Sequence, residues 1–155
     1  MGLQICIIVP VYRFKEMAAT MNDKLSVGTT QSRTITVDAD RTIDFMGEDC
    51  RVYATPSLVR DIEHTCRDLI VENVPEGQDS VGVIVSIAHT APTLLGMAVT
   101  VGVTVTELEG RKIAFEFTAK DALDTICKGR HERFIVDVDK TQDRLRQKAA
   151  KWQGG

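Results

Sequence analysis

The sequence predicts an α+β domain in which one long apolar helix packs against a curved antiparallel sheet. A helix pattern starts at Thr55-Pro56, and apolar residues then recur at helical spacing until Pro75 and Gly77 stop the run. After that the period changes to two, in runs separated by short turns. Strands joined by short turns are antiparallel. A strand, a helix and four more strands therefore predict a five-stranded sheet wrapped around the helix.

The remaining elements follow from local patterns. The first strand is predicted from about Thr29 to Val37, and an acidic connector follows as far as Asp49. Thr55, placed before proline, is predicted to be the N-cap of the helix. Next comes a strand in which Val81, Val83, Val85 and Ile87 share a face, and further strands are predicted near 97–105, 113–117 and 125–138. Turns are predicted at Glu109-Gly110 and at Asp121 to Asp124, and a bulge at Gly129. The last predicted element is a charged helix over 141–152.

One acidic residue stands out within the helix. Glu63 falls in a row with Val59, Cys66 and Ile70. An acid in an apolar row is expected to be paired or functional. The residues predicted to point outward are Arg60, Asp61, His64, Arg67 and Asp68.

Composition limits the class of protein. The chain has 155 residues, 43% of them hydrophobic, and a net charge of −3, which predicts one globular domain and gives no sign of nucleic acid or a membrane as partner. Four separated cysteines without a CxxC pair favour free thiols and a cytoplasmic location. Residues 1–24 show no clear period and are interpreted as an extension of unknown role before a domain over 25–155. The apolar segment Leu3 to Tyr12 is too short to span a membrane.

Three side chains are candidates for catalysis. Thr55, Glu63 and His89 supply a hydroxyl, a carboxylate and an imidazole, which are the groups that break ester-like bonds. Each has a structural alternative: a helix cap, an ion pair and a buried core histidine. No metal site is expected, because no His/Cys cluster has zinc spacing.

Two further groups give weaker signals. His131 and Arg133 share a strand face that Glu132 opposes, which is a poor arrangement for a triad or a metal site. The basic run in the terminal helix is either a solvated face or an attraction for the phosphates of a ligand. That run consists of Arg144, Arg146, Lys148 and Lys151.

From Val52 to about Lys148 the chain resembles the fluoroacetyl-CoA thioesterase branch of the hotdog-fold thioesterases. The resemblance runs through the segments VYATPSLVRDIEHT, SVGVIVSIAHTAPTLLG, LEGRKIAFEFTAKD and GRHERFIVDVDK. It implies a hotdog fold, a long central helix wrapped by the sheet, with two subunits side by side and active sites at their interface. A homodimer or a dimer of dimers is therefore expected.

The resemblance also implies roles for individual residues. The catalytic threonine, glutamate and histidine of the family fall on Thr55, Glu63 and His89. The glycine next to the thioester carbonyl falls on Gly82, and the arginine of the late strand motif on Arg133. The expected activity is hydrolysis of a short or polar acyl-CoA, with coenzyme A as part of the substrate and no separate cofactor.

One stretch departs from the family pattern. Phenylalanines shortly before the catalytic threonine shape a lid in the fluoroacetyl-specific enzyme, whereas residues 46–50 here are largely polar and acidic, with Phe45 only nearby. Fluoroacetyl specificity is therefore not expected to transfer.

Two other functions remain as alternatives. A hydratase or dehydratase acting on acyl-CoA is disfavoured by Thr55, because that chemistry usually lacks the threonine. A non-catalytic acyl-CoA-binding or lipid-binding module is disfavoured by the complete set of Thr55, Glu63 and His89.

Overall fold

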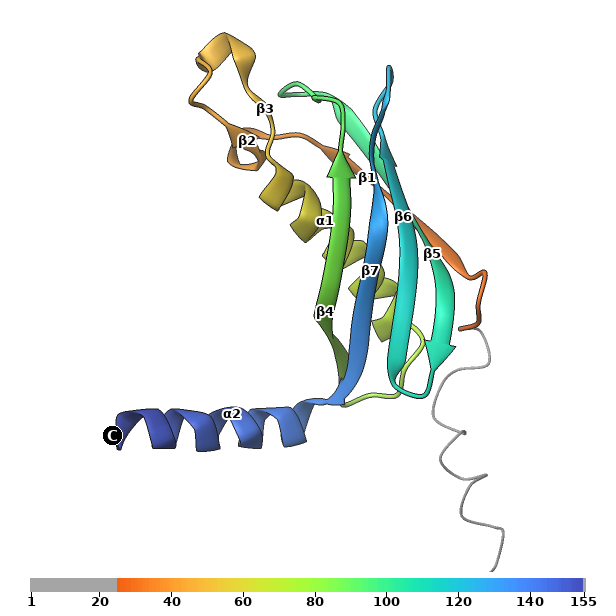
Figure 1. Ribbon diagram of the computed structural model, residues 1–155, viewed down its shortest axis with the longest axis vertical. Coiled ribbons are helices and arrows are strands. Elements are labelled where there is room, and N and C mark those ends of the chain that lie inside the picture. The colour runs from red at the N-terminus through yellow and green to blue at the C-terminus, as the bar shows by residue number, and fades with distance from the viewer. Residues whose placement is uncertain (1–24, 155) are drawn as a thin grey trace, which may run out of the picture.

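A five-stranded antiparallel sheet curves around one long helix, α1 (Thr55–Val71), in the computed structural model, which describes residues 25–154 (Figure 1). The strand order is β1-β5-β6-β7-β4. The α+β architecture and the five-stranded sheet are confirmed. The bounds are Thr30–Thr36 for β1, Gln78–His89 for β4, Ala98–Glu109 for β5, Lys112–Lys120 for β6 and Thr125–Asp137 for β7. The predicted extension over 1–24 lies outside the described residues.

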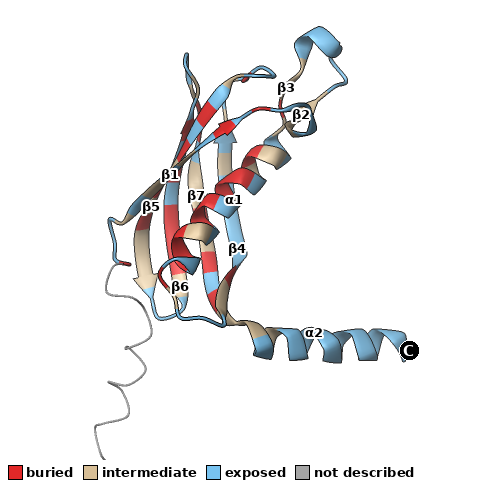
Figure 2. Cartoon of the chain, turned by 180° about the vertical axis from the view of Figure 1, so that it is seen from behind, coloured by how far each residue is buried: buried red, intermediate tan, exposed pale blue. Residues whose placement is uncertain are grey.

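The core lies between α1 and the inner face of the sheet (Figure 2). The helix buries its apolar stripe there, including Leu58, Ile62 and Ile70. Alternate residues of the central strands meet this stripe, as the period-two pattern predicts. The residues of β5 and β6 in this hydrophobic core are Val99, Val101, Val103, Val105, Ile113, Phe115, Phe117 and Ala119.

The acidic connector contains regular structure that the sequence pattern did not show. Two short strands, β2 (Thr42–Ile43) and β3 (Val52–Tyr53), pair with each other. Single 3₁₀ turns, η2 (Ala39–Arg41) and η3 (Glu48–Cys50), flank and separate them. A two-residue strand is too short to display an alternating period, so no pattern could reveal it.

The predicted outward orientation of Asp61 is wrong, because the connector packs over this residue. Its side chain is buried rather than outward, and accepts hydrogen bonds from the Tyr53 hydroxyl at 2.6 Å and from Arg41 Nε at 2.8 Å. The hydrogen bond and ion pair to Asp61 raise the pKa of Arg41. The connector therefore packs on a part of α1 that helical periodicity alone assigned to solvent.

Thr55 is not the N-cap of α1, contrary to prediction. Ala54 occupies the cap position without a side-chain hydrogen bond, and Thr55 is the first helical residue, followed by Pro56. Proline is well tolerated there because it lacks only an N–H that has no partner inside the helix. The Thr55 hydroxyl is thus left free of a capping bond.

Strand β4 differs most from its predicted form. It is an edge strand, and it carries a bulge: Gly82 pairs with Arg133 and Ile84 with Glu132, which leaves Val83 as the extra residue. A bulge breaks the alternation of faces, so Val81, Val83, Val85 and Ile87 do not share one buried face. Large apolar side chains are exposed along the strand: Val81, Val83, Ile84 and Val85.

The bulge predicted at Gly129 is absent. Gly129 pairs regularly with Ile87 on one side and Phe117 on the other. A Cβ at this position would collide with the Ser86 carbonyl and the Phe117 ring. The glycine thus marks a close approach between neighbouring strands.

Both predicted turns form. Gly110 adopts a positive φ of 58° in the β5–β6 turn, a conformation that glycine tolerates. In the β6–β7 turn, Asp121 Oδ1 accepts hydrogen bonds from the N–H groups of Leu123 and Asp124 at 2.9 and 2.8 Å.

The terminal helix α2 (Val138–Gln153) begins three residues earlier than predicted and has no buried residue. It extends away from the sheet past the β4 edge (Figure 1). No helix among the described residues is long and apolar enough to cross a membrane.

Candidate active site

The hydroxyl of Thr55 and the imidazole of His89 form one pair. Thr55 Oγ1 lies 2.9 Å from Nδ1 of His89, which ends strand β4. The start of α1 and the end of β4 thus bring together two side chains that are far apart in sequence. A hydroxyl bonded to an imidazole is the arrangement in which a base activates a nucleophile. The structure places these two predicted residues together.

The surroundings of His89 favour the neutral form of its imidazole. Burial lowers its pKa from 6.5, and a backbone interaction at Ala91 offsets this in part. Its Nε2 atom is buried and has no hydrogen-bond partner among the described residues. An unsatisfied buried nitrogen is costly unless a further group reaches it, which points to a binding position beside the imidazole.

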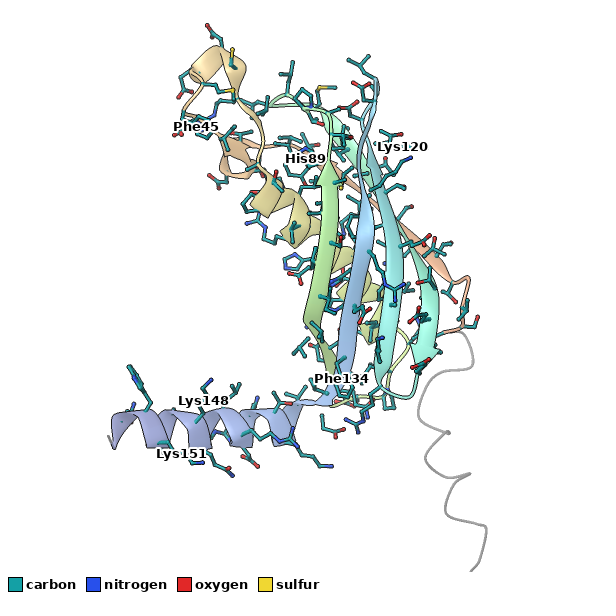
Figure 3. All side chains as sticks on the ribbon, viewed as in Figure 1. Phe45, His89, Lys120, Phe134, Lys148 and Lys151 are labelled. Carbon is teal, nitrogen blue, oxygen red and sulfur yellow. The ribbon has the colours of Figure 1, made fainter. Side chains whose placement is uncertain are left out.

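A cavity of about 460 Å³ opens next to this pair. Figure 3 shows His89 and Phe45 at the same end of the molecule. None of the residues within 25–154 that line the cavity is an acid, a lysine or an arginine. Tyr53 presents its ring there, because its hydroxyl is bound to Asp61. Its apolar walls are formed by Ile43, Phe45, Val52, Pro56, Ala91 and Pro92.

Glu63 lies elsewhere on α1, against Gly82 of β4. A Cβ at position 82 would collide with Glu63 Oε1. Gly82 therefore leaves the space that the carboxylate occupies. The side chain of Glu63 is 35% exposed, so it faces both the protein interior and the β4 edge of the sheet.

A buried network holds the inner side of Glu63. Arg133 Nη1 lies 3.8 Å from Glu63 Oε1, while Arg133 donates to Ser80 Oγ at 2.9 Å and to Ser80 O at 2.7 Å. Burial lowers the pKa of Arg133, and Glu63 opposes that change. A buried guanidinium needs its donors satisfied and a counterion nearby, and here Ser80 and Glu63 meet those needs.

The tautomer of His131 follows from its partners. Its Nδ1 lies 2.8 Å from the Ile84 carbonyl, which can only accept, so Nδ1 carries the proton. Burial lowers the pKa of His131, so Nε2 is unprotonated and accepts from Arg133 Nη1 at 3.1 Å. The 3.5 Å approach of Nε2 to Glu63 is therefore not an ion pair, and Arg133 is the cation that faces Glu63.

The structure thus places the predicted site residues in two groups. Thr55 and His89 form one, and Glu63, Gly82 and Arg133 form the other. With a rise of about 1.5 Å per residue, Glu63 lies roughly 12 Å along the helix axis from Thr55. One subunit therefore carries two separated halves of the predicted catalytic set.

Sequence reasoning undervalued His131 and missed Ser80. Alternation correctly put His131 and Arg133 on one strand face, but it could not show that this face is buried against Glu63. Two charged or titratable side chains on the inner face of a core strand were the available signal.

The two cysteines buried in the described part of the chain are not reactive thiols. Burial raises the pKa of Cys66 to about 12 and that of Cys127 to about 11, so neither is a thiolate at neutral pH. Among residues 25–154, no group of three or more His, Cys, Asp or Glu side chains is placed to hold a metal ion.

Comparison with known proteins shows the family of the chain. A family model described as fluoroacetyl-CoA-specific thioesterase matches residues 37–139, which include the Thr55–His89 pair and the Glu63 group. The chain belongs to this family. The fluoroacetyl-CoA thioesterase of Streptantibioticus cattleyicolor is 29% identical over 135 residues, covering 83% of this chain and 97% of that protein.

Solved structures of thioesterases have the same fold. A fluoroacetyl-CoA thioesterase matches with a TM-score of 0.75 and 28% identity, covering 81% of this chain and 98% of its own. A thioesterase superfamily member from Thermus thermophilus matches with a TM-score of 0.76 and 27% identity. The match covers 84% of this chain and 97% of that protein. A hot-dog-like protein from Thermanaerovibrio acidaminovorans matches with a TM-score of 0.74 and 25% identity. The match covers 88% of this chain and 96% of that protein. The predicted hotdog fold is confirmed.

Proposed function

We propose that this protein hydrolyses a short acyl-CoA thioester to the free acid and CoA, at a site formed between two subunits. The observation that carries the proposal is the 2.9 Å pair of Thr55 Oγ1 and His89 Nδ1 beside an apolar cavity. Membership of a thioesterase family supports it, and one solved fluoroacetyl-CoA thioesterase holds fluoroacetate and CoA.

The reaction adds water across the thioester bond. An oxygen nucleophile attacks the carbonyl carbon, neutral His89 takes its proton, and CoA leaves as the thiol once a proton reaches its sulfur. Either Thr55 is acylated and then hydrolysed, or Thr55 positions the attacking water. In the second route the Glu63 carboxylate either polarises that water or attacks the carbonyl itself, which expels CoA and forms an anhydride that the water then hydrolyses.

Negative charge that develops on the carbonyl oxygen needs a donor. The bulge in β4 leaves Val83 out of the regular pairing directly after Gly82, and we propose that a backbone N–H at this bulge supplies the donor. Arg133, expected among the substrate-binding residues, is proposed to hold the Glu63 carboxylate in place, because its donors are directed to Ser80, His131 and Glu63.

The cavity favours an uncharged acyl group. The described residues that line it include no lysine or arginine, so a carboxylate at the end of the acyl chain would lose its hydration without gaining a counterion from them. Of the short or polar acyl groups expected from the sequence, we therefore propose a short, uncharged one. No cofactor beyond the CoA of the substrate is proposed.

The two groups of site residues are proposed to join across a homodimer, either alone or within a dimer of dimers. Strand β4 offers an exposed apolar edge, and an unprotected edge invites pairing with another strand. Antiparallel pairing of two β4 strands would bring Glu63 of the partner subunit toward Thr55 and His89. A site of this kind would be incomplete in a monomer.

A cytoplasmic location is proposed because the substrate is a CoA thioester. The absence of a membrane-crossing helix among the described residues is compatible with it.

A panel of acyl-CoA thioesters assayed for free CoA tests the function. The wild type is expected to release CoA. In Glu63→Gln the rate should fall because the activation barrier rises by about 2 kcal/mol or more, as expected for the loss of a catalytic carboxylate. Glu72→Gln, on an exposed residue at the end of α1, is the matched control. Acyl-CoA binding without CoA release would favour the binding module, and addition or loss of water in the acyl chain would favour the hydratase.

A further inference from the structure

Helix α2 carries positive charges that form no ion pair with the described residues. Of its basic residues, Lys140 pairs with Asp137 and Arg146 with Asp143. The others have no ion pair within residues 25–154, and their spacing of four and then three residues places them on one helix face. These residues, called here the basic face, are Arg144, Lys148 and Lys151.

An apolar stripe runs beside the basic face. Leu145 and Trp152 are 60% and 82% exposed and lie seven residues apart, so they project from the same side of the helix. Every described residue of α2 is at least partly exposed (Figure 2). Both surfaces are therefore open in a single subunit.

The start of α2 is tied to the start of β4. Asp137, the last residue of β7, is paired with Gln78, and Val138 N donates to Gly77 O at 2.9 Å. From there α2 runs outward past the free edge of the sheet, and Lys148 and Lys151 lie on the part that projects (Figure 3). The helix thus points toward the space that a second subunit paired at β4 would fill.

Antiparallel pairing fixes which part of that subunit α2 would meet. In such a pair the first residue of one β4 lies near the last residue of the other. The first turn of α2, which follows the Asp137–Gln78 pair, would then lie near His89 of the partner subunit. The residues that follow His89 line the active-site cavity, so α2 would cross the mouth of the partner's site.

The end of the subunit that carries His89 and the cavity needs added positive charge to bind CoA. The connector before α1 is acidic, and its two arginines are already engaged: Arg41 with Asp38 and Asp61, and Arg51 with Glu48. CoA carries several phosphate charges, which this surface would repel. The acidic side chains in the connector are Asp38, Asp40, Asp44, Glu48 and Asp49.

We propose that the basic face of α2 binds the phosphate groups of CoA at the active site of the partner subunit. The proposal rests on the dimer and the thioester substrate put forward above. Amine and guanidinium groups suit this role because they form charge-assisted hydrogen bonds with phosphate oxygens. The helix of one subunit would then hold the acyl-CoA thioester at Thr55 and His89 of the other subunit.

The test compares two thioesters of the same acyl group. One carries CoA, and the other carries N-acetylcysteamine, which has no phosphate. For the double variant Lys148→Glu/Lys151→Glu, we expect KM for the CoA thioester to rise about tenfold or more with kcat nearly unchanged. The N-acetylcysteamine thioester should be turned over as by the wild type. Lys128→Glu, on the outer face of the sheet, is the matched charge control and should change neither KM.

Three results would overturn the proposal. They are an unchanged KM for the CoA thioester, an equal loss on both thioesters, and a full effect from Lys120→Glu alone. Lys120 lies at the same end of its own subunit as His89 (Figure 3), so that last result would place the phosphates on it. If the wild type hydrolyses neither thioester, the proposed function fails instead. Calorimetry with CoA alone then still decides whether the basic face binds it.

Mixed dimers show which subunit supplies the helix. One subunit carries Thr55→Ala and the other carries Lys148→Glu/Lys151→Glu. The only intact threonine then stands in the subunit whose own α2 is altered. A component with wild-type KM is expected if α2 acts on the partner's site, whereas a raised KM throughout would show that α2 serves its own subunit.

Discussion

Thr55 Oγ1 and His89 Nδ1 lie 2.9 Å apart, and this bond takes the hydroxyl away from the helix terminus where the sequence had placed it as a cap. Ala54 holds the cap position instead. A residue that starts a helix but bonds to another element contributes little to helix stability. The Thr55 hydroxyl is therefore available for the catalytic role that we propose for the Thr55–His89 pair.

Removing the Thr55 hydroxyl should cost activity but little stability. Thr55→Val keeps the branched shape and loses the hydroxyl, so CoA release should fall by about 100-fold or more, while the free energy of unfolding changes by less than about 1 kcal/mol. Thr55→Ser should retain measurable turnover. Denaturant unfolding together with the CoA assay measures both, with Ser57→Ala in the same helical turn as control. A Thr55→Val variant with wild-type turnover would make the hydroxyl dispensable.

Gly82 should be intolerant of a single added methyl group. In Gly82→Ala the new Cβ would collide with the Glu63 carboxylate and displace it, so kcat/KM should fall by about tenfold or more. Gly102→Ala is the matched control, because its Cβ would meet only Thr118 Oγ1, at an ordinary 3.9 Å. Steady-state kinetics on both variants checks this. Equal activities would mean that the position of Glu63 is not critical.

The pH dependence follows from the direction of the His89 shift. Burial lowers its pKa from 6.5, so the imidazole stays neutral and able to accept a proton at lower pH than a free histidine. The value of kcat/KM should therefore reach half its maximum below pH 6.5, rise to a plateau at higher pH and remain on that plateau at pH 8. A histidine whose pKa is lowered on folding also costs stability as pH falls below 6.5, so melting temperature must be recorded in the same buffers. A midpoint above pH 6.5 would contradict the assignment.

A lysine on the free edge of β4 should separate the subunits. Val83 is 61% exposed on that strand, and a charge on a sheet edge opposes strand pairing. Val83→Lys should therefore sediment as a monomer and lose CoA release. Val27→Lys is matched in exposure, also 61%, but precedes β1 and should remain dimeric. If the wild type is itself a stable monomer at micromolar concentration, the shared site is wrong.

The fold could be predicted from the sequence because its periods are long and clear. The helix after Thr55-Pro56 and the alternating strands after it run for many residues, so local pattern and tertiary packing agree. The turns at Gly110 and Asp121 carry their own local chemistry. These features depend on near neighbours, which a sequence displays directly.

The errors arise where distant segments meet. The burial of Asp61 depends on Tyr53 and Arg41, and no helical period contains that information. The exposure of β4 depends on the bulge in this strand and on its place at the sheet edge, and the alternating pattern showed neither. His131 gained importance only because Arg133 and Glu63 converge on it. The site residues taken from the family resemblance remain predictions that the geometry supports in part.

The central claim is that Thr55 and His89 of one subunit work with Glu63 of the other. Mixing inactive Thr55→Ala and Glu63→Gln subunits, followed by measurement of CoA release from a confirmed acyl-CoA substrate, tests it most directly. If the site is shared, each mixed dimer contains one site with all three groups intact, and a random mixture should recover about a quarter of wild-type activity. A mixture no more active than the two variants alone would contradict the shared site.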